Sequence, residues 1–321
     1  MNALTRDLVK LVETAEQSQK TREELSVSDR KFREKLHLMP PVGWLNDPNG
    51  LCQFQGIYHA FFQYSPFNAE GGVKMWGHYT SKDMIKWEYQ GTALYPDQPF
   101  DCHGVYSGSA FIEDGKMYLY YTGNVKLEDG EYDYIRTGRE GNTVLVITED
   151  GKTFGKKKEL MRNSDYPDDL TCHVRDPKVW KENGTYYMVQ GARTNKDVGQ
   201  VLVFESEDKV NWKFRNRVES EKPFGYMWEC PDYFKIGDKK LLSTSVQGLE
   251  GAVGLLNSNK AKVVDRFSDI SSETEELAAS SQDILGKVDQ QSVEMENIHT
   301  AIESLHNVVT KLNEIMDQFT V

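Results

Sequence analysis

The sequence predicts a mainly β protein: a truncated five-bladed β-propeller with an N-terminal helix and a C-terminal α-helical coiled-coil segment. Three patterns lead to this prediction: helical periodicity at the start, β-forming runs that recur at a blade-like interval, and heptads towards the end. We therefore expect an N-terminal helical extension over 1–33, a partial propeller over 34–250 and a helical tail over 251–321.

The N-terminal segment contains apolar residues at helical spacing among many charges, and it lacks Gly and Pro. These residues are Leu4, Leu8, Leu11, Val12 and Ala15. Such spacing gathers apolar side chains on one face of an amphipathic helix. We expect this face to pack against the domain that follows; binding to a partner is the alternative.

The middle of the chain contains four similar β-forming runs, and each begins at a glycine. They start at positions 56, 115, 184 and 237, and are therefore 59, 69 and 53 residues apart: GIYHAFFQY, GKMYLYYTG, GTYYMVQGA and GDKKLLSTSV. Between them lie the related segments SKDMIKWE (81–88), TEDGKTF (148–154) and SEDKVNWKF (206–214). Propeller blades of four strands repeat at roughly 40–50 residues. We expect three blades and the first half of a fourth.

The tail has a strict alternation of four- and three-residue steps from 270 to 319. Twelve of its fifteen seam positions are apolar, and the exceptions are Thr274, Ser281 and Gln291. This regularity is typical of a left-handed coiled coil, and one helix cannot bury such a seam alone. We expect self-association or a helical partner through 270–319.

Charge restricts the class of partner. The net charge of −12 argues against nucleic acid and against an anionic membrane surface, because both carry negative charge. The tail alone carries −7, from 5 Lys and Arg against 12 Asp and Glu in 251–321. A small neutral or mildly charged substrate fits this balance better.

The cysteines and the N-terminus indicate a cytoplasmic location. The four cysteines are far apart and show no CxxC spacing, so we expect reduced thiols: Cys52, Cys102, Cys172 and Cys230. The first residues lack the apolar region of a signal peptide, and no run approaches the roughly 20 apolar residues of a membrane helix.

The most informative motif is WLNDPNG, residues 44–50. Asp-Pro followed by Asn-Gly predicts a tight turn that holds the Asp47 carboxylate at the end of a strand. An ordinary turn without chemistry is the alternative for this motif taken alone.

Two further acidic motifs lie near the starts of later repeat units. HVRDP (173–177) places Arg175 beside Asp176, and WECPDYF (228–234) places Glu229 beside Trp228. The innermost strand of each blade lines the central channel of a propeller. We therefore expect the three carboxylates to converge there, with Arg175 orienting Asp176.

Three carboxylates of this kind favour glycoside hydrolysis with retention, which needs one ionised carboxylate and one protonated carboxyl. Asp47, in a polar turn, is the candidate nucleophile. We expect Trp228 to raise the pKa of Glu229 and keep it protonated as general acid. Asp176 is left to hold sugar hydroxyls.

Six motifs together resemble glycoside hydrolase family 32 over about 31–250. They are WLNDPNG, FFQYSP (61–66), WGHYTS (76–81), YSGSA (106–110), RDP (175–177) and EC (229–230). The resemblance implies hydrolysis of the β-fructofuranosidic bond of sucrose 6-phosphate or sucrose. It implies that Asp47 is the nucleophile, Glu229 the acid/base and Asp176 the transition-state stabiliser, and that the fructosyl unit contacts Trp44, Asn46, Gln63, Tyr106, Ser107 and Arg175.

Other residues add a few expectations. Among the aromatic residues, Trp44 and Trp76 are the candidate sugar platforms, and we expect most others to be core. The histidines lack the spacing of zinc ligands, and neither GxxxxGK[ST] nor GxGxxG occurs, so we expect no metal and no cofactor.

The tail from about 262 to 321 resembles the carboxyl end of a bacterial chemoreceptor signalling domain. This leaves two alternatives to an active hydrolase. In the first alternative, the chain is an inactive truncated fusion whose tail is a helical oligomerisation or signalling segment. In the second, it is an oligomeric sugar sensor.

Overall fold

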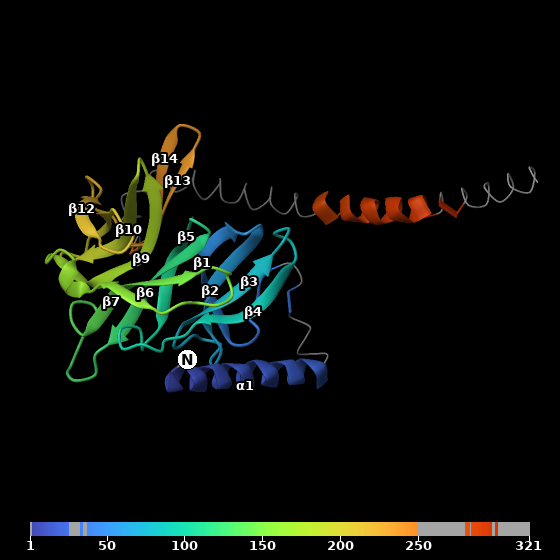
Figure 1. Cartoon of the computed structure of the whole chain (residues 1–321), viewed down its shortest axis with the longest axis horizontal. Coiled ribbons are helices and arrows are strands. Elements are labelled where there is room, and N and C mark those ends of the chain that lie inside the picture. Colours follow the sequence, from blue (N-terminus) through green and yellow to red (C-terminus); the bar gives the residue numbers. More distant parts are fainter. Residues whose placement is uncertain are drawn as a thin grey trace, which may run out of the picture. The chain divides into compact units, whose positions relative to one another are not determined.

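The computed structural model describes two compact units of the chain, 1–252 and 253–321 (Figure 1). The residues that it describes are 2–25, 33–34, 37–248, 280–282, 284–296 and 299–300.

The first unit is built from antiparallel sheets that follow one another in chain order (Figure 1). The first sheet contains β1 (Trp44–Phe54), β2 (Ile57–Ser65), β3 (Met75–Ser81) and β4 (Trp87–Leu94). The second contains β5 (Val105–Glu113), β6 (Lys116–Lys126), β7 (Arg139–Thr148) and β8 (Lys158–Met161). The third contains β9 (Leu170–Glu182), β10 (Thr185–Thr194), β11 (Gly199–Ser206) and β12 (Lys213–Val218).

A fourth sheet pairs only β13 (Met227–Ile236) with β14 (Lys239–Gln247). A short 3-10 helix, Asn163–Asp165, precedes the third sheet. The four glycine-led runs form β2, β6, β10 and β14, the second strand of each sheet. The prediction of three blades and half of a fourth is thus confirmed in this propeller-like arrangement.

The three related segments between blade strands also fold alike. Each contains an acidic side chain that accepts hydrogen bonds from backbone N–H groups two and three residues ahead, at Asp83, Asp150 and Asp208. This Asx turn connects the third strand of a blade to the fourth. The repeat in the sequence therefore reflects a repeated turn as well as repeated strands.

The hydrophobic core lies between successive sheets. Phe61 and Trp76 of the first sheet pack with Leu119 and Val144 of the second. Another cluster joins the second sheet to the third, and a smaller one with Trp228 joins the third to the fourth. The inner strands β1, β5, β9 and β13 lie next to one another in that order.

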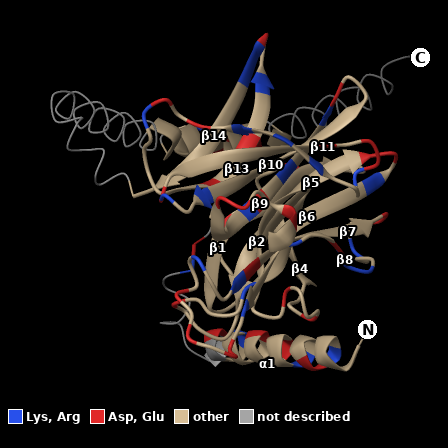
Figure 2. Cartoon of the chain, turned by 90° about the vertical axis from the view of Figure 1, so that its left-hand side faces the viewer, with Lys and Arg blue, Asp and Glu red and all other residues tan. Residues whose placement is uncertain are grey.

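Helix α1 (Ala3–Leu25) packs on the first sheet (Figure 1). Val12 is 2% exposed and contacts a cluster with Phe62, Tyr64 and Met75. The side chain of Glu16 accepts hydrogen bonds from the hydroxyls of Tyr64 and Tyr89. Figure 2 shows basic and acidic residues along the rest of this helix. The expected packing role is confirmed, although the predicted apolar face is wrong at Leu4 and Leu11, which are exposed.

The tail is described only in short helical pieces between 280 and 300. In these pieces the seam positions Ser281, Ile284, Val288, Gln291 and Met295 are exposed in the single chain. The coiled coil stays a prediction, and most of its seam lies outside the described residues. None of the helices in the described ranges is long and apolar enough to span a membrane.

Candidate functional site

Each of the four inner strands has an irregular register where a predicted site residue lies. The ladder shifts between Leu45 and Pro48 in β1, between Val105 and Gly108 in β5, and between Glu229 and Asp232 in β13. In β9 it shifts between Arg175 and Lys178, around Asp176. Bulges of this kind redirect side chains out of the regular alternation.

Proline explains three of these irregularities. A proline directly follows Asp47 and Asp176, and another, Pro231, lies two residues after Glu229. Proline cannot donate a ladder hydrogen bond. The DPNG segment therefore folds as a bulged part of β1, so the predicted turn at a strand end is wrong. Asp176 and Cys230 also adopt positive φ angles of 64° and 47°.

The Asp47 carboxylate is held by a chain of polar side chains from three strands. Ser107 Oγ donates to Asp47 Oδ2 at 2.7 Å. Gln63 Nε2 donates to Ser107 Oγ at 2.6 Å, and Asn46 Nδ2 donates to Gln63 Oε1 at 3.2 Å. Gln63 and Ser107 are buried, whereas Asn46 is exposed. The structure thus links three other predicted site residues in one hydrogen-bond chain that ends at the Asp47 carboxylate.

Asp176 is the most buried of the three carboxylates, at 6% exposure. Its Oδ2 accepts the Cys230 N–H at 2.8 Å, and its own N–H donates to Thr122 Oγ1 at 2.9 Å. The pKa of Asp176 is raised to about 6, mainly by burial and to a smaller extent by the charges of Glu229 and Asp47. Arg175 and the Cys230 N–H act in the opposite direction. Asp176 therefore lies close enough to Asp47 and Glu229 for both charges to act on its pKa.

Glu229 is paired with an arginine. Its Oε1 accepts from Arg175 Nη2 and its Oε2 accepts from Gln247 Nε2. Arg175 also contacts the Nδ1 atom of His173 at 2.6 Å. Arg175 therefore binds Glu229 directly, so the prediction that it orients Asp176 is wrong.

Trp76 and Trp228 lie in different surroundings from those that the sequence predicts. Trp76 is fully buried beneath the site, and its Nε1 donates to the Tyr106 carbonyl at 3.0 Å. It therefore supports the backbone of Tyr106, and the prediction that it is a sugar platform is wrong. Trp228 packs between the third and fourth sheets, where its Nε1 donates to the Phe224 carbonyl at 3.0 Å. The groups beside the Glu229 carboxyl are polar, so the predicted apolar setting is wrong too.

Trp44 and Tyr106, by contrast, are only partly buried. The Nζ atom of Lys74 lies 5.1 Å from the centre of the Trp44 ring and 5.2 Å from that of the Tyr106 ring. Gly71 also lies against the Trp44 ring, because a methyl group added there would come within 3.7 Å of it. Both aromatic residues thus belong to one edge of the site.

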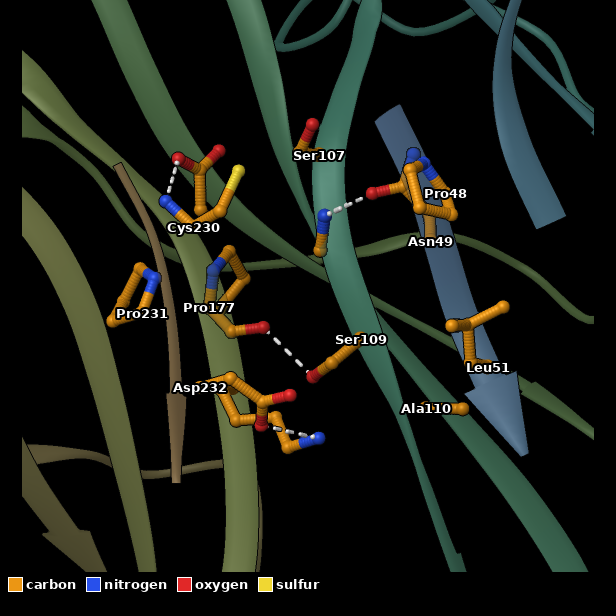
Figure 3. A pocket seen from close by; sticks show the side chains of 14 residues that line it. Pro48, Asn49, Leu51, Ser107, Ser109, Ala110, Pro177, Cys230, Pro231 and Asp232 are labelled. Atoms are coloured by element: carbon orange, nitrogen blue, oxygen red, sulfur yellow. Dashed lines mark hydrogen bonds and ion pairs between the residues drawn. The ribbon is translucent and has the colours of Figure 1, made fainter. Parts of the chain in front are cut away.

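A cavity of about 130 Å³ lies between the four inner strands (Figure 3). Asn49 and Ser107 line it on one side, and Asp176 and Cys230 on the other. Figure 3 shows the hydrogen bond from the Gly108 N–H to Asn49 Oδ1, which joins β1 to β5. Asp176 is the one catalytic candidate that lines this cavity, whereas Asp47 and Glu229 are represented there by their chain neighbours Pro48 and Cys230.

Sequence reasoning missed three supporting residues: Asn49, Thr122 and Gln247. Asn49 was visible in the DPNG motif, where its Nδ2 donates to the Asp47 carbonyl at 2.9 Å. Thr122 and Gln247 lie in second strands, and nothing local distinguishes them from other polar strand residues. Within the described ranges, no group of three or more His, Cys, Asp or Glu side chains could hold a metal ion.

Comparison with known proteins agrees with this geometry. Residues 37–298 match the model of the glycosyl hydrolases family 32 N-terminal domain. The chain is 44% identical over 223 residues to a sucrose-6-phosphate hydrolase of Bacillus subtilis, a match that covers 68% of this chain and 44% of that protein. It is 44% identical over 215 residues to a raffinose invertase of Escherichia coli, covering 67% and 44%.

Solved structures have the same fold. The sucrose-6-phosphate hydrolase of Lactobacillus gasseri superposes with a TM-score of 0.66 at 31% identity, over 75% of this chain and 47% of that one. A Bombyx mori family 32 beta-fructofuranosidase gives 0.61 at 35% identity, over 74% and 49%. The chain thus spans about half the length of these relatives.

Proposed function

Because this chain belongs to glycoside hydrolase family 32, we propose that its site cleaves the β-fructofuranosidic bond of sucrose 6-phosphate or sucrose. The relatives named above carry such activities in their names. The observation that carries the proposal is that Ser107, which bonds to Asp47, lines one cavity with Asp176 and with Cys230, the residue after Glu229, whose N–H bonds to Asp176. Retaining glycosidases use two such carboxyl groups on either side of the scissile bond.

In the proposed first step, Asp47 attacks the anomeric carbon of the fructosyl unit. The hydrogen bond from Ser107 orients the attacking carboxylate. Glu229 gives its proton to the glycosidic oxygen, and the glucosyl part leaves as the alcohol. The product of this step is a fructosyl ester of Asp47.

In the second step, Glu229 accepts a proton from water, and the water oxygen attacks the same carbon. The ester bond to Asp47 breaks, and fructose leaves with its configuration retained. Arg175 binds Glu229 and so holds it in one position through both steps. Asp176, fixed by the Cys230 N–H, is placed to accept hydrogen bonds from sugar hydroxyls.

The direct test is an assay of the purified chain with sucrose and with sucrose 6-phosphate. We expect release of reducing sugar, and a loss of at least about 10³-fold in kcat in Asp47→Asn and in Glu229→Gln. A folded chain that turns over neither sugar would refute the proposal. Sugar binding without turnover would instead support the sensor alternative.

We also propose that the tail is an association segment. The heptad seam supports this, and the exposed Ile284, Val288 and Met295 agree with it, because an apolar seam needs a partner. The resemblance of 262–321 to a chemoreceptor, a cytoplasmic location and a five-bladed closure of the propeller remain proposals that follow from the sequence.

A further inference from the structure

Two basic residues face each other across the second sheet. Lys126, the last residue of β6, is the direct partner of Arg139, the first residue of β7. Like charges directly opposite each other in an antiparallel pair destabilise the sheet. Such a pair is most easily tolerated where an anion lies between the two charges.

No carboxylate of the described residues lies within 4.0 Å of either positive group. The Nη1 atom of Arg139 donates to Asn124 Oδ1 at 3.3 Å, and its Nε atom is buried with no hydrogen-bond partner there. The Nζ atom of Lys126 lies 5.3 Å from the centre of the Tyr134 ring. Among nearby acids, Glu128 pairs with His103 at 3.6 Å. Glu140 follows Arg139 directly, so its side chain points to the other face of β7.

This pair lies at the same end of the sheets as the candidate site. A methyl group added at Gly141 would lie 2.6 Å from the Val174 carbonyl oxygen, so the starts of β7 and β9 are in contact. His173 is near both Arg139 and the acid/base candidate: its ring contacts Arg175, which binds Glu229, and the charge of Arg139 acts on its pKa.

The pKa of His173 is affected by several positive charges around it, including that of Arg139. The pKa of His173 is lowered to about 3, mainly by burial and also by the positive charges of Arg175, Arg139 and Arg193. Two of these arginines are neutralised: Arg175 by Glu229, and Arg193 by Asp197 at 2.9 Å. Among the three arginines that lower the pKa of His173, Arg139 is therefore the one without a carboxylate partner in the described part of the chain.

We propose that Arg139 and Lys126 bind the phosphate group of a phosphorylated leaving group, so that the site prefers a sugar phosphate over the neutral disaccharide. The inference rests on the proposed function. A phosphate monoester would otherwise approach three carboxylates, and it would be repelled without a compensating cation. An arginine can bind two phosphate oxygens at once, and a lysine adds a point charge.

The test measures binding in an Asp47→Asn background, in which the sugars are not consumed. Dissociation constants for sucrose 6-phosphate and sucrose are measured by calorimetry in that protein and in four further variants. Arg139→Gln removes the proposed contact, and Arg139→Lys keeps its charge. Lys116→Gln removes a positive charge from the opposite end of β6, and Lys74→Gln removes the cation beside Trp44 and Tyr106.

We expect sucrose 6-phosphate to bind more tightly than sucrose. Arg139→Gln should reduce this preference roughly ten- to hundredfold, the size expected for a lost charge-assisted hydrogen bond. Arg139→Lys should restore part of it, and Lys116→Gln should change it less than about twofold. Melting curves of all variants establish that the fold is retained.

Three results would overturn the inference: equal affinity for the two sugars, a preference that survives Arg139→Gln, or a preference that disappears only in Lys74→Gln. Inorganic phosphate that binds as tightly as sucrose 6-phosphate would also overturn it, since the site would then recognise any phosphate. Sucrose hydrolysis by the unmodified chain is measured separately, so the proposed function can stand when this inference fails.

Discussion

At the scale of single residues, the site depends on which groups form hydrogen bonds to its three carboxylates. Asp176 has the raised pKa, and within the described residues its carboxylate accepts one backbone hydrogen bond, from the Cys230 N–H. Glu229 instead has an arginine and an amide as partners, and Asp47 has a serine hydroxyl. The arginine favours the ionised form of Glu229, which is the form that accepts a proton from water in the second proposed step.

Asp176 should make the fold less stable at neutral and higher pH. Its pKa in the folded chain, about 6, lies above the ordinary value of 3.8. Its stabilising contribution is therefore complete below pH 3.8 and is lost as the pH rises through about 6. The difference corresponds to roughly 3 kcal/mol.

Replacement Asp176→Asn should thus raise the free energy of unfolding at pH 8 by up to roughly 3 kcal/mol, and by little at pH 4. Urea unfolding at the two pH values measures this, with the exposed Asp114→Asn as control. An equal gain in the free energy of unfolding at both pH values would contradict the explanation that burial raises the pKa of Asp176. The same variant should lose hydrolytic activity.

At the scale of elements, each blade contributes one inner strand, and an irregular register in that strand directs a polar group into the site. Helix α1 acts differently, because it covers the first sheet and contributes no residue to the three acidic motifs. Its buried contact is narrow, since Val12 is the single fully buried apolar residue among those of the helix that the structure describes.

Val12→Ala should therefore lower the free energy of unfolding by about 1–3 kcal/mol, through lost apolar contact and a residual cavity. The matched change Leu11→Ala removes an apolar side chain that is 56% exposed and should have little effect. Chemical denaturation of both variants measures these changes in the free energy of unfolding. Similar losses at the two positions would mean that α1 docks through a wider face.

At the scale of the whole molecule, the chain combines a β-rich unit with a tail of different composition. Only Phe267 and Phe319, of 36 aromatic residues, lie beyond position 250. The family match nevertheless continues to residue 298, past the boundary of the first compact unit at 252. Experiments on either unit should therefore use the whole chain.

If the tail associates through its seam, Ile284→Glu combined with Val288→Glu should reduce the mass of the particle in solution to that of one chain. Two carboxylates per helix cannot be buried against a partner helix without a large desolvation cost. Light scattering during size-exclusion chromatography measures the mass. Ser292→Glu, off the seam, is the control, and an unchanged mass in the double variant would exclude this seam.

The sequence alone was sufficient to predict the repeat, the second strands and the helix at the start, and it singled out the three carboxylates as candidates. These features depend on periodicity and on residue types a few positions apart, which short-range physics determines. The strand runs were recognisable because β-formers alternate or continue after a glycine turn.

Only the tertiary structure decided which groups meet. Arg175 lies next to Asp176 in the chain, yet it binds Glu229, 54 residues away, because adjacent blades bring β9 and β13 together. Trp76 lies in a motif of the site but fills the core between the first two sheets. Contacts between blades depend on packing across sheets, and no local pattern encodes which face of a bulged strand a side chain occupies.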